Sequence, residues 1–198
     1  MESLAVVVKM VSVNKGKWDE KRSIKEKHNF NKRWIRACKN VLNDNGTIWI
    51  SGTMHNIYSI GMVLEEEGFK ILNNITWKKL NPPPNISCRT FVHSTETILW
   101  AKKDISKAKH KFNYDVMKKL NNNKQMKDVW ETSLTKPSEK KCGKHPTQKP
   151  IELLERIILC DADHGHRADK ARTRRAGRRV SYGAHLQPAQ PHGWYRRL

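Results

Sequence analysis

The spacing of apolar residues along the chain predicts a first helix that begins near residue 29. Apolar side chains recur every three or four positions over residues 29–42, which places them on one helical face. The NDNG stretch at 43–46 is typical of a helix end, whereas residues 15–28 are charged without such spacing and are expected to form an exposed loop. The expected core face consists of Phe30, Trp34, Ala37, Cys38, Val41 and Leu42.

Shorter apolar runs then alternate with helical spacing. The run TIWIS at 47–51 is rich in β-branched and aromatic residues, which predicts a buried strand. A second helix is expected from about His55 to Glu67, and Gly68 is suited to end it. These elements alternate as they do in layered α/β proteins.

Two further extended segments surround a proline-rich loop. Residues 69–79 and 96–103 are expected to be strands. Between them, Pro82, Pro83 and Pro84 exclude both a helix and a central strand. The sequence therefore predicts the α/β class rather than a bundle of helices.

The segment after these strands has little apolar periodicity until a last helix. Residues 104–141 are rich in Lys and Asn and are expected to be an insertion. Pro150 suits the first position of a helix. The expected apolar residues of that helix are Ile151, Leu154, Ile157 and Ile158.

Chain length and net charge indicate the domain count and the kind of binding partner. A chain of 198 residues is long enough for one domain with a full core. Its formal net charge of +20 favours an anionic partner, and nucleic acid is the leading candidate. A solvated lysine-rich surface without a partner is the alternative that charge alone leaves open.

The cysteines and the apolar runs indicate where the protein resides. The four cysteines are widely spaced without a CxxC pair, which fits a reducing cytoplasm better than a disulfide framework. Cys142 with His145, and the cluster around Cys160, lack the second half of a zinc site, so no metal is expected. No apolar run is long enough to cross a membrane and no signal peptide is recognisable, so a cytoplasmic protein is expected.

Residue usage changes abruptly after Cys160. Residues 1–160 contain 25 Lys, 5 Arg and 15 Asn, whereas residues 161–198 contain one Lys, eight Arg and no Asn. Because Lys and Asn codons are AT-rich and Arg codons mostly GC-rich, we interpret residues 161–198 as a tail encoded by foreign DNA and without fixed structure. A native basic arm that binds nucleic acid is the alternative.

Three blocks resemble one family of enzymes in order and spacing. They are "FNKRWIRACKNVLNDNGTIWISG", "ILNNITWKKLNPPPNISCRTFVHSTETILWAKK" and "GKHPTQKPIELLERII". Together, over roughly residues 9–160, they resemble the DNA amino-methyltransferases that modify adenine N6 or cytosine N4, in the subgroup that places its catalytic segment first and its cofactor segment last. The resemblance implies S-adenosylmethionine as methyl donor, a partial Rossmann-like, doubly wound α/β sheet, and double-stranded DNA as substrate. It also implies a bacterial restriction system with a cognate endonuclease.

The resemblance implies which residues contact DNA. Enzymes of this kind flip the target base out of the duplex, so the base needs a stacking partner and the strand needs phosphate contacts. Trp77 is the expected stacking residue, and core packing is its alternative. Lys78 and Lys79 are the expected phosphate contacts, with a solvated strand end as the alternative. Asn85 and Arg89, which follow in the same block, complete the expected DNA-binding set.

The resemblance also implies a cofactor-binding loop. The segment KHPTQKP precedes a helix, where backbone amides can meet an anionic group. The residues implied for the cofactor are His145, Thr147, Gln148 and Lys149, although His145 has capping or packing as an alternative. By position, residues 104–141 correspond to the family's target-recognition region.

Two motifs of the family are missing from the printed sequence. A (Asp/Asn/Ser)-Pro-Pro-(Tyr/Phe) segment should precede the charged loop, but "MESLAVV" stands there and Pro84 is followed by Asn85. A strand and glycine turn of the type DxFxGSG should follow the helix that ends at Cys160. We therefore assign no catalytic residue and expect a truncated, inactive methyltransferase. A non-catalytic nucleic-acid-binding module and a non-functional fragment are the alternatives.

Overall fold

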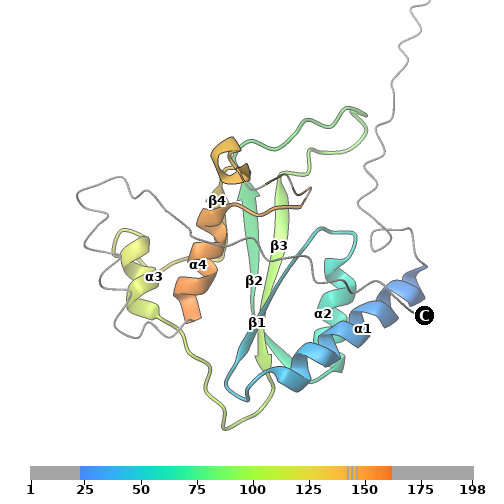
Figure 1. The fold of residues 1–198 in the computed structure, drawn as a ribbon, viewed down its shortest axis with the longest axis vertical. Coiled ribbons are helices and arrows are strands. Elements are labelled where there is room, and N and C mark those ends of the chain that lie inside the picture. The colour runs from blue at the N-terminus through green and yellow to red at the C-terminus, as the bar shows by residue number, and fades with distance from the viewer. Residues whose placement is uncertain (1–22, 142, 144, 146, 162–198) are drawn as a thin grey trace, which may run out of the picture. The chain divides into compact units, whose positions relative to one another are not determined.

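The structure is a computed structural model, and it describes residues 23–141, 143, 145 and 147–161. A four-stranded sheet carries helices on both of its faces (Figure 1). The elements are α1 (Ile24–Val41), β1 (Thr47–Gly52), α2 (Ile57–Glu66), β2 (Phe69–Lys79), β3 (Thr95–Lys103), α3 (Tyr114–Leu120), β4 (Val129–Thr132), the 3₁₀ helix η2 (Pro137–Lys140) and α4 (Ile151–Asp161). Apart from Asp161, the tail predicted at 161–198 lies outside the described residues.

The sheet is mixed, and its strand order is β1-β3-β2-β4. The central strand β3 runs antiparallel to both β1 and β2, whereas β4 pairs parallel to β2. Strands β1, β2 and β4 therefore run in one direction. The predicted α/β class is confirmed, and the predicted strands at 47–51, 69–79 and 96–103 each lie within one residue of the observed bounds.

Helix α1 starts earlier than the sequence pattern predicted. Residues 24–28 were expected to belong to a loop, but they form the first turns of the helix. The backbone N–H of Glu26 donates to the Ser23 hydroxyl at 3.2 Å, and the Ser23 N–H donates to the Glu26 carboxylate at 2.8 Å. This reciprocal capping box stabilises a helix end that apolar periodicity does not report.

The buried face of α1 is also rotated from the predicted one. Asn31 and Ile35 are its fully buried residues, whereas the predicted core residue Val41 is 85% exposed. The Asn31 side-chain amide donates to the oxygens of Asn56 and Ser59 at 2.8 and 3.0 Å. These hydrogen bonds satisfy the polar group of Asn31 and allow it to be buried. The apolar pattern missed this residue because it places only apolar side chains on the buried face.

Helices α1 and α2 cover one face of the sheet with an aliphatic core. We call this the aliphatic face. Its buried residues are Ile35, Ile50, Ile57, Ile60, Val63, Leu64, Phe69, Leu99 and Ala101. Gly68 ends α2 with a φ of +72°, as predicted, which is the left-handed conformation that glycine adopts without strain.

Helices α3 and α4 cover the opposite face, which is rich in aromatic residues. We call this the aromatic face. Its buried residues are Ile75, Trp77, Ile98, Trp100, Met117, Trp130, Leu153 and Cys160. Trp49 of β1 stacks on Trp100 of β3, with ring centroids 4.9 Å apart. Side chains alternate between the faces along β3, since Ile98 and Trp100 belong to one core and Leu99 and Ala101 to the other.

Strand β2 serves both faces because it contains a bulge. Its pairing with β3 shifts between Ile71 and Asn73. Before the shift, Phe69 and Ile71 pack in the aliphatic core, and after it Ile75 and Trp77 pack in the aromatic core. All four positions are odd-numbered, so an unbroken strand would place them on one side.

The segment 104–141 is more ordered than its sequence pattern suggested. It contains α3, η2 and the sheet strand β4. Trp130 of β4 lies opposite Trp77 of β2 and is buried in the aromatic core. A strand of four residues is too short to show a convincing apolar alternation, so periodicity missed it.

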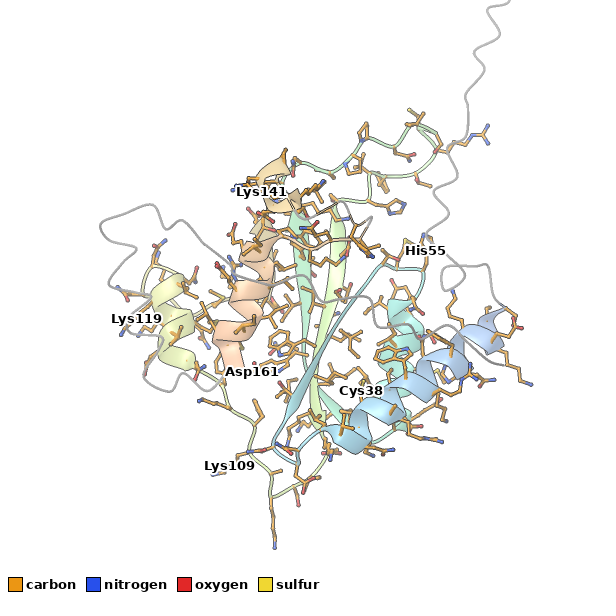
Figure 2. All side chains as sticks on the ribbon, viewed as in Figure 1. Cys38, His55, Lys109, Lys119, Lys141 and Asp161 are labelled. Carbon is orange, nitrogen blue, oxygen red and sulfur yellow. The ribbon has the colours of Figure 1, made fainter. Side chains whose placement is uncertain are left out.

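Helix α4 is present as predicted, but it buries other residues. Leu153 and Cys160 are buried, whereas the predicted core residues Ile151, Leu154 and Ile158 are exposed. The helix extends one residue past the predicted boundary, to Asp161, which Figure 2 shows at its end. The Asp161 carboxylate accepts hydrogen bonds from the side chains of Thr47 and Trp49 of β1, the second at 2.9 Å.

None of the helices that the structure describes is long and apolar enough to cross a membrane.

Candidate nucleic-acid and cofactor site

Several chain segments that are distant in sequence meet at one end of the sheet. Strands β2 and β4 end there at Lys79 and Thr132, and β3 begins there at Thr95. The backbone N–H of Lys79 donates to the Ser94 carbonyl at 2.8 Å, which closes the loop between β2 and β3. Ligands of α/β proteins bind at the carboxyl ends of parallel strands, so this end is the natural place for a site.

Trp77 lies at the base of this end of the sheet. Its side chain is 1% exposed, and its indole N–H donates to the Thr132 hydroxyl at 2.7 Å. An indole that is buried and hydrogen-bonded has no free face for a nucleobase. The stacking role predicted for Trp77 therefore does not fit its position, and the alternative of core packing does.

A largely buried carboxylate joins two of the predicted site residues. Glu96 of β3 accepts from the Lys79 ammonium at 2.9 Å and from the Lys149 ammonium at 2.5 Å. The two lysine nitrogens lie 5.5 and 5.4 Å from the centre of the Trp77 ring, within the range of cation–π attraction. We call Trp77, Lys79, Glu96 and Lys149 the lysine–glutamate cluster.

The cluster keeps Glu96 ionised although the residue is largely buried. Burial raises the pKa of this carboxyl, but the hydrogen bonds and charges of Lys149 and Lys79 outweigh burial, so the net shift of the pKa is downward. Two ammonium groups against one carboxylate leave a net charge of +1. Each ammonium has three N–H donors, so the cluster can receive a further anionic oxygen, such as that of a phosphate or a carboxylate.

Two other predicted DNA-binding residues, Lys78 and Arg89, have exposed side chains. Lys78 is half exposed and pairs with Glu131 of β4 at 2.8 Å, so it is open to solvent but not without a partner. Arg89 is exposed on the loop between β2 and β3. Both positions are accessible to DNA, and their roles stay predictions.

The Asn85 side chain forms hydrogen bonds to other residues of the same loop. Its amide nitrogen donates to the backbone carbonyl and the hydroxyl of Thr90, both at 2.7 Å. Its amide oxygen accepts from the N–H and the hydroxyl of Ser87, at 3.2 and 2.8 Å. A primary amide has two donors and two acceptor positions, so these bonds use its full capacity. The direct DNA contact predicted for Asn85 therefore does not fit this arrangement.

The predicted cofactor loop leads into the start of α4. His145 is exposed, and its Nδ1 accepts from the Thr147 N–H at 3.3 Å. The Gln148 side-chain amide donates to the Glu139 backbone carbonyl at 2.9 Å, and the backbone carbonyl of Gln148 accepts from the Thr135 hydroxyl at 2.9 Å. Of the four predicted cofactor residues, the structure brings Lys149 together with the DNA-side residue Lys79.

The first amide of α4 already meets an acidic group. The Ile151 N–H donates to the Glu139 carboxylate at 3.1 Å. A carboxylate is what the positive end of a helix dipole stabilises. This end of α4 is thus chemically suited to the carboxylate of a ligand, which would compete with Glu139.

Three residues of the site were missed from the sequence. Glu96, Thr132 and Glu139 each bind a predicted site residue or its neighbour, yet the sequence singled out none of them. Glu96 had one signal, since it is a single acid at the start of an apolar strand in a chain with 39 basic residues. Thr132 and Glu139 had none, because the strand and the turn that hold them were not predicted.

Comparison with known proteins decides the family. A family of proteins described as DNA methylases matches residues 8–166, which is most of the chain. The chain belongs to this DNA methylase family. The predicted relationship is confirmed, and both segments that form the lysine–glutamate cluster lie within the matched residues.

Curated relatives of this DNA methylase come from bacteria. The chain is 67% identical over 156 residues to the Type II methyltransferase M2.DpnII of Streptococcus pneumoniae, covering 79% of this chain and 58% of that protein. It is 67% identical over 150 residues to M2.LlaDCHI of Lactococcus lactis subsp. cremoris, covering 76% of this chain and 56% of that protein. The chain therefore spans somewhat over half the length of these relatives.

Solved structures agree with the fold. A crystal structure of an M1.HpyAVI–SAM complex matches with a TM-score of 0.53 and 36% sequence identity, covering 67% of this chain and 61% of that one. The PvuII DNA methyltransferase, which is cytosine-N4-specific, matches with a TM-score of 0.55, and the match covers 73% of this chain and 59% of that one. At 16% identity the second match supports the fold alone. The Rossmann-like class predicted for the DNA methylase is thus confirmed.

Proposed function

We propose that this chain is part of a site-specific DNA methyltransferase that transfers a methyl group from S-adenosylmethionine to the exocyclic amino group of adenine, with cytosine the less favoured target. The observation that carries the proposal is the lysine–glutamate cluster. It joins the segment implied for DNA binding to the segment implied for cofactor binding, at the carboxyl end of β2. Substrate and methyl donor must meet in one place, and this contact brings the two segments there.

The residues of the cofactor segment fit the chemistry of S-adenosylmethionine, which supplies the electrophilic methyl group when it is bound. Its methionine moiety carries a carboxylate. In the structure, Lys149 donates to the Glu96 carboxylate, and the first amide of α4 donates to the Glu139 carboxylate. In this proposal Lys149 and Gln148 orient the methionine moiety, while His145 and Thr147 border it on the exposed side.

The DNA side of the proposal rests on the exposed cations. Lys78 and Arg89 neutralise phosphates, while Lys79 belongs to the cluster and positions Lys149 through the carboxylate of Glu96, which both lysines bind. Residues 104–141 supply target recognition through their exposed parts, since β4 and the buried side of α3 belong to the core. The partners proposed for the whole protein are double-stranded DNA and a cognate restriction endonuclease.

We further propose that the 198-residue chain on its own transfers no methyl group. The amino group of the target needs a hydrogen-bond acceptor, and the cofactor needs a glycine turn; neither motif occurs in the printed sequence. Methyl transfer requires the donor carbon and the acceptor nitrogen in line at near-attack distance, and loss of this positioning removes much of the rate enhancement. Binding of DNA without chemistry is the second candidate function, and the net charge of +20 favours it.

The test compares two proteins incubated with labelled S-adenosylmethionine and bacterial DNA. One is this chain, and the other is a chimera with a family-type catalytic segment before Lys9 and a family-type DxFxGSG segment after Cys160. We expect label in DNA only with the chimera, mainly on adenine. Methylation by the unmodified chain would contradict the proposed inactivity, and a folded chimera without activity would contradict the proposed function.

A further inference from the structure

The loop between β2 and β3 presents four large apolar side chains to solvent, and Ile86 and Phe91 are the most exposed of them. Figure 1 shows this connection leaving the end of the sheet as a long open loop. Phe91 is 95% exposed and Ile86 is 81% exposed. Large apolar side chains at such exposure mark contact sites when they occur together on one feature.

The tip of this loop is held in shape from within. Asn85 bonds to Ser87 on one side and to Thr90 on the other, so one amide fixes both arms of the tip. The Cys88 N–H donates to the Asn85 carbonyl at 3.2 Å, and Cys88 adopts a φ of +51° at the turn. The prolines at 82–84 stiffen the approach to the tip. A preformed tip loses little freedom when it binds.

The charge of the loop points to a polyanion. Between residues 80 and 94 the ionisable side chains are Arg89, His93 and the thiol of Cys88, and no acidic residue occurs. Arg89 lies two positions from Phe91, and Lys78 lies near the base of the loop on β2. An apolar tip flanked by cations is the chemistry of side chains that enter a DNA base stack while neighbouring cations hold the phosphates.

We propose that the tip of the β2–β3 loop enters the DNA duplex, with Phe91 filling the gap in the base stack that a flipped base leaves and Arg89 bound to an adjoining phosphate. The inference rests on the proposed DNA-directed function and adds a residue outside the set that the sequence implied. Phe91 is a positioning residue, since it touches the duplex next to the target and not the reacting atoms. The base of the same loop is closed at the lysine–glutamate cluster, because the backbone N–H of Lys79, a member of the cluster, donates to the Ser94 carbonyl at 2.8 Å.

The experiment uses the full chain and needs no knowledge of the recognition sequence. Fluorescein-labelled duplexes of about 25 base pairs are prepared either intact or with one abasic site, and dissociation constants are measured by anisotropy at fixed salt. An abasic site provides the gap in advance, so a protein with a wedge saves the unstacking that intact DNA demands. We expect the chain to bind the abasic duplex about 10-fold more tightly than the intact one.

The variants separate the wedge from general binding. Phe91→Ala is expected to reduce this preference to about 1, and Phe91→Leu to keep part of it, because leucine also serves as an intercalating side chain. Tyr58→Ala is the matched control, since Tyr58 is an aromatic residue that is 75% exposed on helix α2 rather than on the loop. It should keep the full preference. Circular dichroism confirms that each variant is folded.

A second readout follows the stack directly. With 2-aminopurine beside the abasic site, the wild-type chain should change the probe's fluorescence and Phe91→Ala should not. A preference that survives Phe91→Ala would overturn the inference and leave the proposed function standing. A folded wild-type chain that binds neither duplex would overturn both. Binding of wild type and Phe91→Ala to anionic phospholipid vesicles is measured as well. If Phe91→Ala lowers the affinity for vesicles and for both duplexes by the same factor, Phe91 makes a general apolar contact, and the proposed insertion into DNA is wrong.

Discussion

The two faces of the sheet place their charges differently. On the aliphatic face, each ion pair has an exposed basic partner: Lys32 and Arg36 of α1, whose side chains are 37% and 60% exposed, bond to Glu66 and Glu67 at the end of α2. On the aromatic face, Glu96 binds both Lys79 and Lys149, and all three side chains lie largely buried against the Trp77 ring. An ion pair with an exposed partner contributes little to stability, whereas a cluster whose charged members are all largely buried must keep its partners. We therefore expect the loss of an ion-pair partner to destabilise the fold more on the aromatic face than on the aliphatic face.

The largest difference between the faces should follow from Trp77→Ala. The change removes a buried indole and leaves the Thr132 hydroxyl without its donor, so we expect the free energy of unfolding to fall by about 3–5 kcal/mol. Urea denaturation followed by fluorescence measures it. Tyr58→Ala on the exposed side of α2 is the control and should change stability by no more than about 0.5 kcal/mol. Equal effects of the two variants would remove the distinction drawn here.

Cysteine labelling tests whether the aromatic face excludes solvent. Burial, assisted by the charge of Asp161, raises the pKa of the Cys160 thiol to about 12. Compared with an ordinary thiol of pKa about 8.5, its thiolate fraction at pH 8 is lower by about three orders of magnitude. In the folded chain, iodoacetamide should modify the exposed Cys88 long before Cys160, as peptide mapping would show. Comparable rates in native buffer would mean that this face is open, and comparable rates in urea are the expected control.

Glu96→Gln tests the buried charges directly. The variant removes the charge that holds two ammonium groups, and we expect a loss of about 1.5–3 kcal/mol at pH 7 by urea denaturation. Because the folded pKa of Glu96 is lowered from 4.5, its stabilisation is present above that pH and disappears as the pH falls through the folded value. The difference between wild type and variant should therefore shrink below about pH 4.5.

The matched change on the aliphatic face is Arg36→Ala. It breaks the hydrogen bonds of 2.8 and 2.9 Å from Arg36 to Glu67, but the arginine is largely exposed. Its effect should be smaller than that of Glu96→Gln under the same conditions. The reverse order would show that the outer ion pairs, rather than the buried cluster, are the important ones.

The smallest effect concerns the end of α1. Ser23→Ala removes one half of the capping box and should lower the free energy of unfolding by about 1 kcal/mol, while Ser23→Asp keeps an acceptor and should cost less. Because α1 belongs to the aliphatic face, DNA affinity measured by anisotropy should stay unchanged. A loss of DNA affinity in a folded Ser23→Ala protein would link the two faces.

The sequence predicted the aliphatic face better than the aromatic one. The strands at 47–51 and 69–79 and the helix ending before Gly68 follow from local apolar spacing, which an α/β core imposes. Trp130 and Thr132 lie in a strand that local spacing does not reveal, because its partner β2 is 50 residues or more away in the chain. The resemblance singled out three members of the lysine–glutamate cluster, Trp77, Lys79 and Lys149, but only tertiary structure supplies the acid between the lysines.

The bulge in β2 constrains how this family can vary in length. Leu72 adds one residue between the part of β2 that packs in the aliphatic core and the part that packs in the aromatic core. Losing or gaining a single residue before Trp77 would turn every later side chain of the strand to the opposite face, with Trp77 and Lys79 among them. Evolution can substitute residues along this strand or change its length in steps of two, whereas a one-residue gap in an alignment of relatives would mark a chain in which this end of the sheet has been repacked.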